Sequence, residues 1–370
     1  MGGPLSLASW KVGGPLSGPG ELESGWPPFW PCIERCVRKA WLCGTDPATG
    51  YCFEHRRGWI RDRMEFLASV FAIDCLTFSI MSNHLHLVFR SRPDVVAAWS
   101  DEEVAQRWLR LFPARRNPDG SPAVPTRPEL NMILNQPEVL ASRRQRLSDV
   151  SWYMRCLAEN IARRSNAEDE ARGHFWEGRF RAQVLLDEAS LLACAAYVDL
   201  NPIRAAMAET PESSKYTGAK DRIDDLTHSS DRTRLSTHDW ERSRGRQHSG
   251  WMSPIEIDEQ HDPVGPHLDH SGRRGSLKGF LSVSLASYLE LLDWTGRQLR
   301  SDKVGAIPSH LQPILTRMGV DTHAWCDVVS RFGRVFMRAA GSPEHLAEEA
   351  SRRGQGWLCA RDNPLGISSA

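Results

Sequence analysis

Two β-rich runs, residues 74–81 and 84–90, are separated in the sequence only by Ser82 and Asn83. A polar pair of this length is typical of a tight β-hairpin, because it leaves room for nothing longer than a turn. The two runs are therefore predicted to pair in an antiparallel sheet. Residues 54–72, just before them, place their apolar side chains on one helical stripe, so we expect a helix there.

The second run carries two histidines on one face. In the stretch MSNHLHLVFR, a single leucine separates His84 from His86. Residues two apart in a strand project from the same side, so both imidazoles can reach one cation while Leu85 points into the core. A pair with this spacing also occurs by chance in ordinary strands. The spacing alone therefore leaves open a pair that only packs.

The charge balance limits what surface the chain can present. Lysine plus arginine and aspartate plus glutamate number 46 each, so the formal net charge is zero. Any basic surface must then be local, and DNA binding is not excluded. The nine cysteines, with no secretory signal and no long apolar run, predict a cytoplasmic protein with free thiols and no membrane partner.

Composition and periodicity divide the 370 residues into several regions. We expect a flexible leader at 1–28, a main domain at 29–217 with an irregular insertion at about 112–146, a polar linker at 218–275, a helical C-terminal region at 276–358 and a tail at 359–370. The insertion is expected to be irregular because it is rich in proline. The linker is expected to be irregular because it is polar and poor in apolar residues.

The stretch FWEGRFRAQV, residues 175–184, alternates strictly and predicts a half-buried strand with Arg179 and Arg181 on its outer face. Arg163 and Arg164 end a predicted helix shortly before it. All four arginines are candidates for binding DNA phosphates, with an ordinary solvated face as the alternative.

Three motifs occur in order along the chain: FSIMSNHLHLVFR, GHFWEGRF and AYVDLNPIRA. Together they resemble the HUH single-strand DNA transposases, specifically the group related to REP-associated tyrosine transposases, over about residues 29–217. The resemblance implies an α+β fold with a ferredoxin-like antiparallel sheet and flanking helices. It also implies that His84 and His86 bind a divalent metal, Mg²⁺ or Mn²⁺, which polarises a scissile phosphate of single-stranded DNA.

In that family a tyrosine on a nearby helix attacks the phosphate, so the strand is cleaved and joined through a phosphotyrosine. The same helix supplies a third metal ligand; Asn160, Ser165 and Asn166 are candidates, and we select Asn166. The resemblance further implies that the partner is single-stranded or hairpin DNA. It leaves a homodimer open.

The residue expected to be the attacking tyrosine is Ile161, so the chain departs from the family pattern at this position. Tyr153 is the only tyrosine on the helix and is our candidate nucleophile. It lies eight residues earlier, about 12 Å along the axis and about 80° around it. Tyr197 is interpreted as a packing residue, and Tyr216 could fold back. Two alternatives remain: metal-activated water attacks in place of a tyrosine, or the protein is a hairpin-binding regulator without strand-transfer activity.

The C-terminal region has amphipathic helical spacing and several arginines. A helix-turn-helix DNA-binding module and a packing or oligomerisation appendage are both compatible with this pattern.

Overall fold

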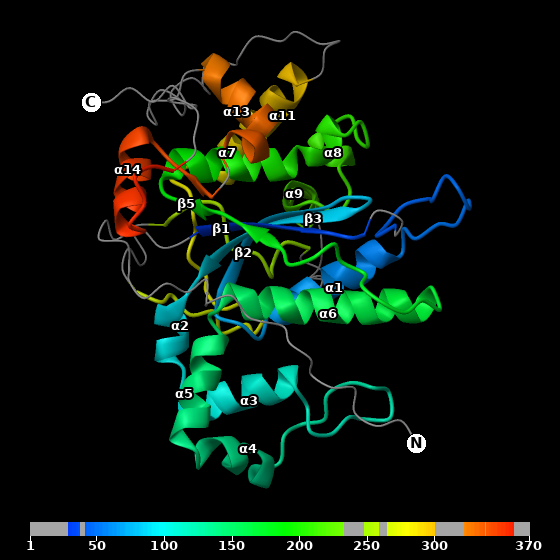
Figure 1. Ribbon diagram of the computed structural model, residues 1–370, viewed down its shortest axis with the longest axis vertical. Coiled ribbons are helices and arrows are strands. Elements are labelled where there is room, and N and C mark those ends of the chain that lie inside the picture. The colour runs from blue at the N-terminus through cyan, green and yellow to red at the C-terminus, as the bar shows by residue number, and fades with distance from the viewer. Residues whose placement is uncertain are drawn as a thin grey trace.

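The computed structural model describes residues 29–37, 41–232, 248–258, 265–299, 322–336 and 338–358. The described residues form a mixed α+β fold, in which a six-stranded, mostly antiparallel sheet lies between helical layers (Figure 1). The α+β class expected from the sequence is confirmed. The predicted leader and tail lie outside the described residues.

The hairpin of β2 and β3 forms one side of the sheet, with β2 at the end of the strand order and β1 on the other side of β3. The predicted hairpin is confirmed, with the turn at residues 81–83. Two short strands continue the sheet beyond β1, and β6 adds to β5 in parallel. The strands are β1 (Phe29–Arg35), β2 (Ile73–Ile80), β3 (His84–Ser91), β4 (Arg181–Ala182), β5 (Val184–Leu185) and β6 (Ala339–Ala340).

One face of the sheet is covered by α1 (Arg56–Ala68) and α6 (Val150–Glu168) (Figure 1). The side chains of β3 that point to this layer are Leu85, Leu87 and Phe89, and all three belong to its apolar core. Burial of such side chains provides most of the stability of the layer.

The opposite face is covered by α7 (Glu188–Asp199), with α11 and α13 packed beyond it (Figure 1). Because side chains alternate along a strand, His84 and His86 point to this second face, as Val88 does. The C-terminal region therefore packs on the main sheet as part of the same core. Its helices are α11 (Leu285–Gln298), α13 (Thr322–Val335) and α14 (Pro343–Arg352).

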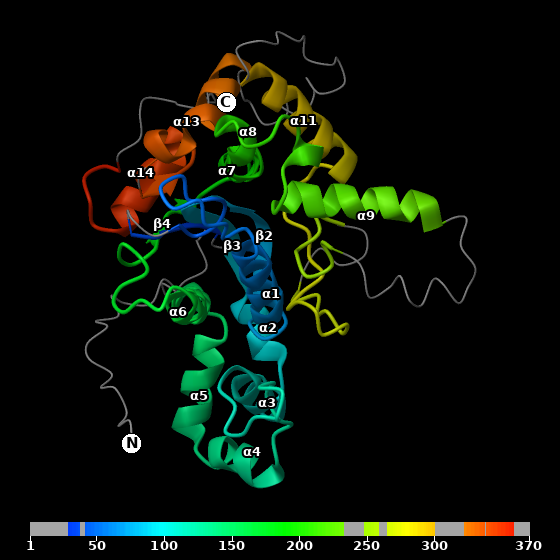
Figure 2. The same cartoon turned by 90° about the vertical axis from the view of Figure 1, so that its right-hand side faces the viewer.

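The insertion is more regular than the sequence indicated. Only residues 112–126 and the two-residue connection 135–136 lack helix, because two of the prolines that follow residue 126 begin helices instead of ending them. Proline is well tolerated in the first turn, where its missing N–H has no helical partner. The helices below the sheet in Figures 1 and 2 are α2 (Pro93–Ala98), α3 (Asp101–Leu111), α4 (Arg127–Leu134) and α5 (Pro137–Arg146).

Residues 218–275 also differ from the expected bare linker where they are described. They begin with α9 (Gly218–Arg232), which packs beside β2 (Figure 2), and Trp251 is fully buried. Two short elements precede α9, namely α8 (Asn201–Arg204) and a 3₁₀ turn (Pro211–Ser213).

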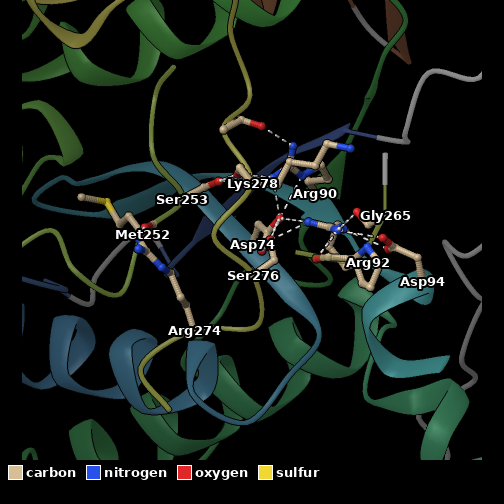
Figure 3. Close-up of polar contacts among 12 residues, drawn as sticks. Asp74, Arg90, Arg92, Asp94, Met252, Ser253, Gly265, Arg274, Ser276 and Lys278 are labelled. Carbon is tan, nitrogen blue, oxygen red and sulfur yellow. Dashed lines mark hydrogen bonds and ion pairs between the residues drawn. The ribbon is translucent and has the colours of Figure 1, made fainter. Parts of the chain in front are cut away.

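A buried polar network attaches this interval and the residues just after it to the sheet (Figure 3). Arg90 donates to the Ser253 hydroxyl at 3.2 Å, and Arg92 donates to the Pro266 carbonyl oxygen at 2.7 Å. The Asp74 carboxylate on β2 accepts hydrogen bonds from Arg90 at 2.6 Å, from Arg92 at 3.1 Å and from the Ser276 hydroxyl at 2.8 Å. Arg90 also donates to the carbonyl oxygens of Gly279 and Lys278. The polar composition that suggested a linker therefore includes residues of a docked, hydrogen-bonded segment.

The stretch 175–184 is not one continuous strand. Only β4 and β5 pair with β1, and Trp176 makes an isolated bridge with Cys36. Phe175 and Trp176 are both buried, so strict alternation fails at its start. In the part of the chain that the structure describes, no helix combines the length and apolarity needed to cross a membrane.

Candidate functional site

A cavity of about 920 Å³ lies where β1 and β3 meet α7 and α13. The register of the sheet brings its floor together, because Arg35 on β1 lies opposite His84 on β3 and Ile33 lies opposite His86. All four residues line the cavity. The two histidines singled out in the sequence are therefore side by side at its base, with ring centroids 4.7 Å apart.

Each imidazole retains a nitrogen that can accept a bond. His84 Nδ1 is 2.6 Å from the amide oxygen of Asn83, which can only accept, so Nδ1 carries the proton and Nε2 keeps its lone pair. His86 is 3% exposed, and its Nε2 is buried without a hydrogen-bond partner among the described residues. A buried nitrogen without a partner is costly unless a ligand occupies it.

Burial also keeps both rings uncharged. Burial, reinforced by the charge of Arg35, lowers the pKa of His84 to about 4. Burial, followed by the charges of His84, Arg204 and Arg35, lowers the pKa of His86 well below its usual value. At neutral pH both imidazoles are therefore neutral, which is the form that binds metal ions.

The walls of the cavity are strongly basic. Six arginines line it against a single acidic residue, Glu177, and they come from β1, β4, the loop before β4, α8 and α13. The net charge of the chain is zero, so this is a local basic surface. Guanidinium groups bind phosphate oxygens well, which makes the cavity suited to a phosphate-bearing ligand. The six are Arg35, Arg179, Arg181, Arg204, Arg331 and Arg334.

Tyr197, on α7, also lines the cavity. Its ring centroid is 5.5 Å from that of His86, and the Arg204 guanidinium lies 4.5 Å from the centre of its ring. Its hydroxyl group makes no hydrogen bond with any described residue. The sequence interpretation of Tyr197 as a packing residue therefore missed its position beside the histidines.

The structure does not bring Tyr153 to the histidine pair. Tyr153 is fully buried between α6 and the opposite face of the sheet, where its hydroxyl donates to the Met64 carbonyl oxygen at 3.0 Å. Burial raises the pKa of its phenol well above the usual value. Ile161 is buried in the same layer. The candidate nucleophile chosen from the sequence is thus separated from His84 and His86 by the sheet.

The other three of the five tyrosines do not line the cavity either. Tyr288 donates to the Asp199 carboxylate at 2.6 Å, Tyr216 lies beneath the Arg57 guanidinium, and Tyr51 is 64% exposed. Tyr197 is therefore the one tyrosine in this site.

Asn166, the selected third metal ligand, is also absent from the cavity lining. Its side-chain amide donates to the Gly173 carbonyl oxygen at 3.0 Å. Within the described ranges, no group of three histidine, cysteine, aspartate or glutamate side chains is arranged to hold a metal. Any metal bound here would have His84 and His86 as its ligands of these residue types, and its other coordination positions would be open.

The four arginines predicted to bind DNA separate into two pairs. Arg179 and Arg181 line the cavity, whereas Arg163 and Arg164 do not. Arg163 forms an ion pair with Glu159 on the same helix, and Arg164 lies 3.7 Å from the centre of the Trp59 ring.

The sequence interpretation missed four of the six cavity arginines, namely Arg35, Arg204 and the two arginines of α13. Arg35 could have been found, because antiparallel pairing of β1 with β3 places it near His84 once the register is known. Nothing local in the sequence indicates that α13 reaches the same cavity. No protein-family model, curated protein or solved structure matches this chain.

Proposed function

We propose that this chain is an HUH transposase-like protein that binds single-stranded DNA, in particular hairpins, and cleaves and rejoins a phosphodiester at His84 and His86. The main support is the position of two neutral imidazoles at the base of an arginine-lined cavity. Phosphodiester cleavage needs the negative charge of the phosphate to be compensated and a nucleophile to be aligned with it.

The topology supports a ferredoxin-like assignment within the α+β class. The order β2-β3-β1-β5, with α1 and α6 on one face, follows the β-α-β-β-α-β pattern of that fold. In this arrangement β3 is an inner strand, so its histidines are held rigidly by neighbours on both sides.

The donor set fits a divalent cation. His86 Nε2 is buried without a partner, and His84 Nε2 keeps its lone pair because Nδ1 is bonded to Asn83. When bound, the cation would compensate charge on the phosphate oxygens. Of the two expected ions, Mn²⁺ suits imidazole nitrogen better than Mg²⁺, which prefers oxygen ligands.

We assign the attacking hydroxyl to Tyr197 in place of Tyr153. The Tyr197 oxygen would form an ester bond with phosphorus as the bond from phosphorus to one bridging oxygen breaks. The phenolic proton passes to water, and the leaving oxygen takes up a proton to become a hydroxyl group. The number of phosphate ester bonds is unchanged, so a strand-end hydroxyl can reverse the step and rejoin DNA. Arg204, above the ring, positions Tyr197 for this attack.

Incubation of the full-length protein with end-labelled single-stranded hairpins and Mn²⁺ or Mg²⁺ tests the proposal. We expect cleaved product and a covalent protein–DNA adduct that mass spectrometry maps to Tyr197. His84→Ala with His86→Ala should abolish cleavage and retain binding, and Tyr197→Phe should abolish the adduct. Tyr153→Phe is the matched control and should retain it. Cleavage that persists without the histidines would exclude this site.

A hairpin-binding protein without cleavage is the second candidate. It is favoured by Ile161, which occupies the expected tyrosine position, has no hydroxyl and is fully buried. In that case hairpin affinity should fall with salt and with Arg179→Ala or Arg181→Ala, while no adduct forms under any metal condition. Trapping an adduct on any tyrosine would eliminate this candidate.

A further inference from the structure

The C-terminal helix α13 forms one wall of the histidine cavity. Arg331, Gly333 and Arg334 line it together with residues of β1 and β4. These residues lie far along the chain from His84, in the region whose role the sequence left open. The question is whether α13 only packs there or also binds the ligand of the cavity.

Several contacts hold α13 in this position. The Phe332 ring lies 5.9 Å from the Tyr197 ring, and Arg204 donates to the Ser330 carbonyl oxygen. Just after the helix, Gln183 donates to the Phe336 carbonyl oxygen at 2.6 Å, and β6 pairs with β5. The helix is thus attached both to α7 and α8 and to the chain just after β4, the strand that carries Arg181.

One edge of the Arg331 guanidinium on α13 pairs with Asp327 one turn earlier, and its other edge is unpaired within the described ranges. The backbone leaves helical geometry at Arg331, with φ −128° and ψ 17°, and the Nε of Arg331 is buried without a hydrogen-bond partner among the described residues. Arg334 forms no ion pair with any residue that the structure describes. Arg334 in the last turn also complements the helix dipole, but the dipole does not account for a second arginine facing the same cavity.

We infer that α13 is the second wall of a channel for single-stranded nucleic acid, in which Arg331 and Arg334 bind backbone phosphates. Arg35, Arg179 and Arg181, which line the same cavity from β1, β4 and the loop before β4, bind the neighbouring part of the strand. Six guanidinium groups around one cavity suit a chain with one negative charge per nucleotide better than a single phosphate. The identity of this polyanion as DNA rests on the proposed function.

The test is fluorescence anisotropy of full-length protein with a labelled single-stranded oligothymidylate and a labelled hairpin across a salt series. A His84→Ala, His86→Ala background keeps the strand intact. In that background, Arg331→Gln with Arg334→Gln should weaken binding roughly tenfold. It should also reduce the slope of log affinity against log salt by about 1.4, since each phosphate contact to a single strand contributes about 0.7.

The matched control is Arg127→Gln with Arg297→Gln, which removes the same charge from exposed positions outside the cavity. Its affinity and slope should stay within about twofold of the parent. Equal slopes and affinities in the two double variants would overturn the inference. Cleavage that still depends on His84 and His86 would then leave the proposed function standing. Failure of the parent to bind any strand would overturn both. Thermal unfolding verifies that each variant is folded.

Discussion

Ile161 and Tyr197 face the two sides of β3. Ile161 packs in the layer formed by α1 and α6, and Tyr197 packs from α7 beside His86. A hydroxyl group at one position therefore cannot replace a hydroxyl group at the other without a movement of a whole helix. The family pattern expects the attacking tyrosine at position 161, whereas the tyrosine that lines the cavity is Tyr197.

Ile161→Tyr should consequently give no covalent DNA adduct at position 161, and any adduct should still map to Tyr197 by mass spectrometry. Ile161 is fully buried in an apolar core, so the larger, polar side chain should lower the free energy of unfolding by about 1–3 kcal/mol. Urea denaturation measures the loss, and denaturing gels with labelled hairpins detect adducts. An adduct mapped to position 161 would show that α6 rearranges to reach the histidines.

Glu34 on β1 makes stability depend on pH. It is 4% exposed, one carboxylate oxygen has no partner among the described residues, and burial raises its pKa from 4.5 to about 8. The unfolded chain releases this proton near pH 4.5, whereas the folded chain holds it until about pH 8. The contribution of Glu34 to stability is therefore complete below pH 4.5, falls as pH rises, and is lost above pH 8.

Glu34→Gln removes this titration and should be the more stable protein at pH 8.5, by up to about 5 kcal/mol, with little difference at pH 4.5. Urea denaturation of both proteins across this range measures the difference. A difference that is constant with pH would show that Glu34 is charged in the folded state throughout.

At the level of elements, the Asp74 network holds the segment around Ser276 against β2 and β3 (Figure 3). Asp74→Ala would leave Arg90 and Arg92 charged and buried without their shared partner. We expect a loss of about 3–5 kcal/mol in unfolding free energy. Asp94→Ala is the control, because Asp94 is half exposed and contacts Arg92 alone; it should cost less than about 1 kcal/mol. Equal losses in the two variants would mean that the network contributes little.

Elements with strong local signals could be predicted from the sequence. The hairpin followed from its two-residue turn, and α1 followed from the apolar stripe of residues 54–72. The helices α4 and α5 were missed because prolines that begin a helix resemble prolines that interrupt one. Residues 218–275 were interpreted as a linker although Ser253 is buried and hydrogen-bonded to Arg90, because a polar residue gives the same signal whether it is solvated or hydrogen-bonded in the interior.

At the level of the whole molecule, the candidate site combines three distant parts of the chain. The histidine pair could be found because both members lie on one strand, whereas Tyr197 and the arginines of α13 reach it only through packing of α7 and α13. Such long-range contacts have no local periodicity. They depend on the buried aromatic residues between these helices, which link the stability of the C-terminal region to the cavity.

Trp325→Ala should therefore affect stability and DNA binding together. Trp325 on α13 is 0% exposed, and its indole N–H donates to the Thr295 hydroxyl at 3.1 Å. Removing its side chain should cost about 3–5 kcal/mol and loosen α13, so hairpin affinity and its salt slope should fall as they do for Arg331→Gln with Arg334→Gln. Thermal unfolding and anisotropy measure both effects. Trp357→Ala, at a site 74% exposed, should change neither. A destabilised Trp325→Ala protein with unchanged DNA binding would show that the strand does not contact α13.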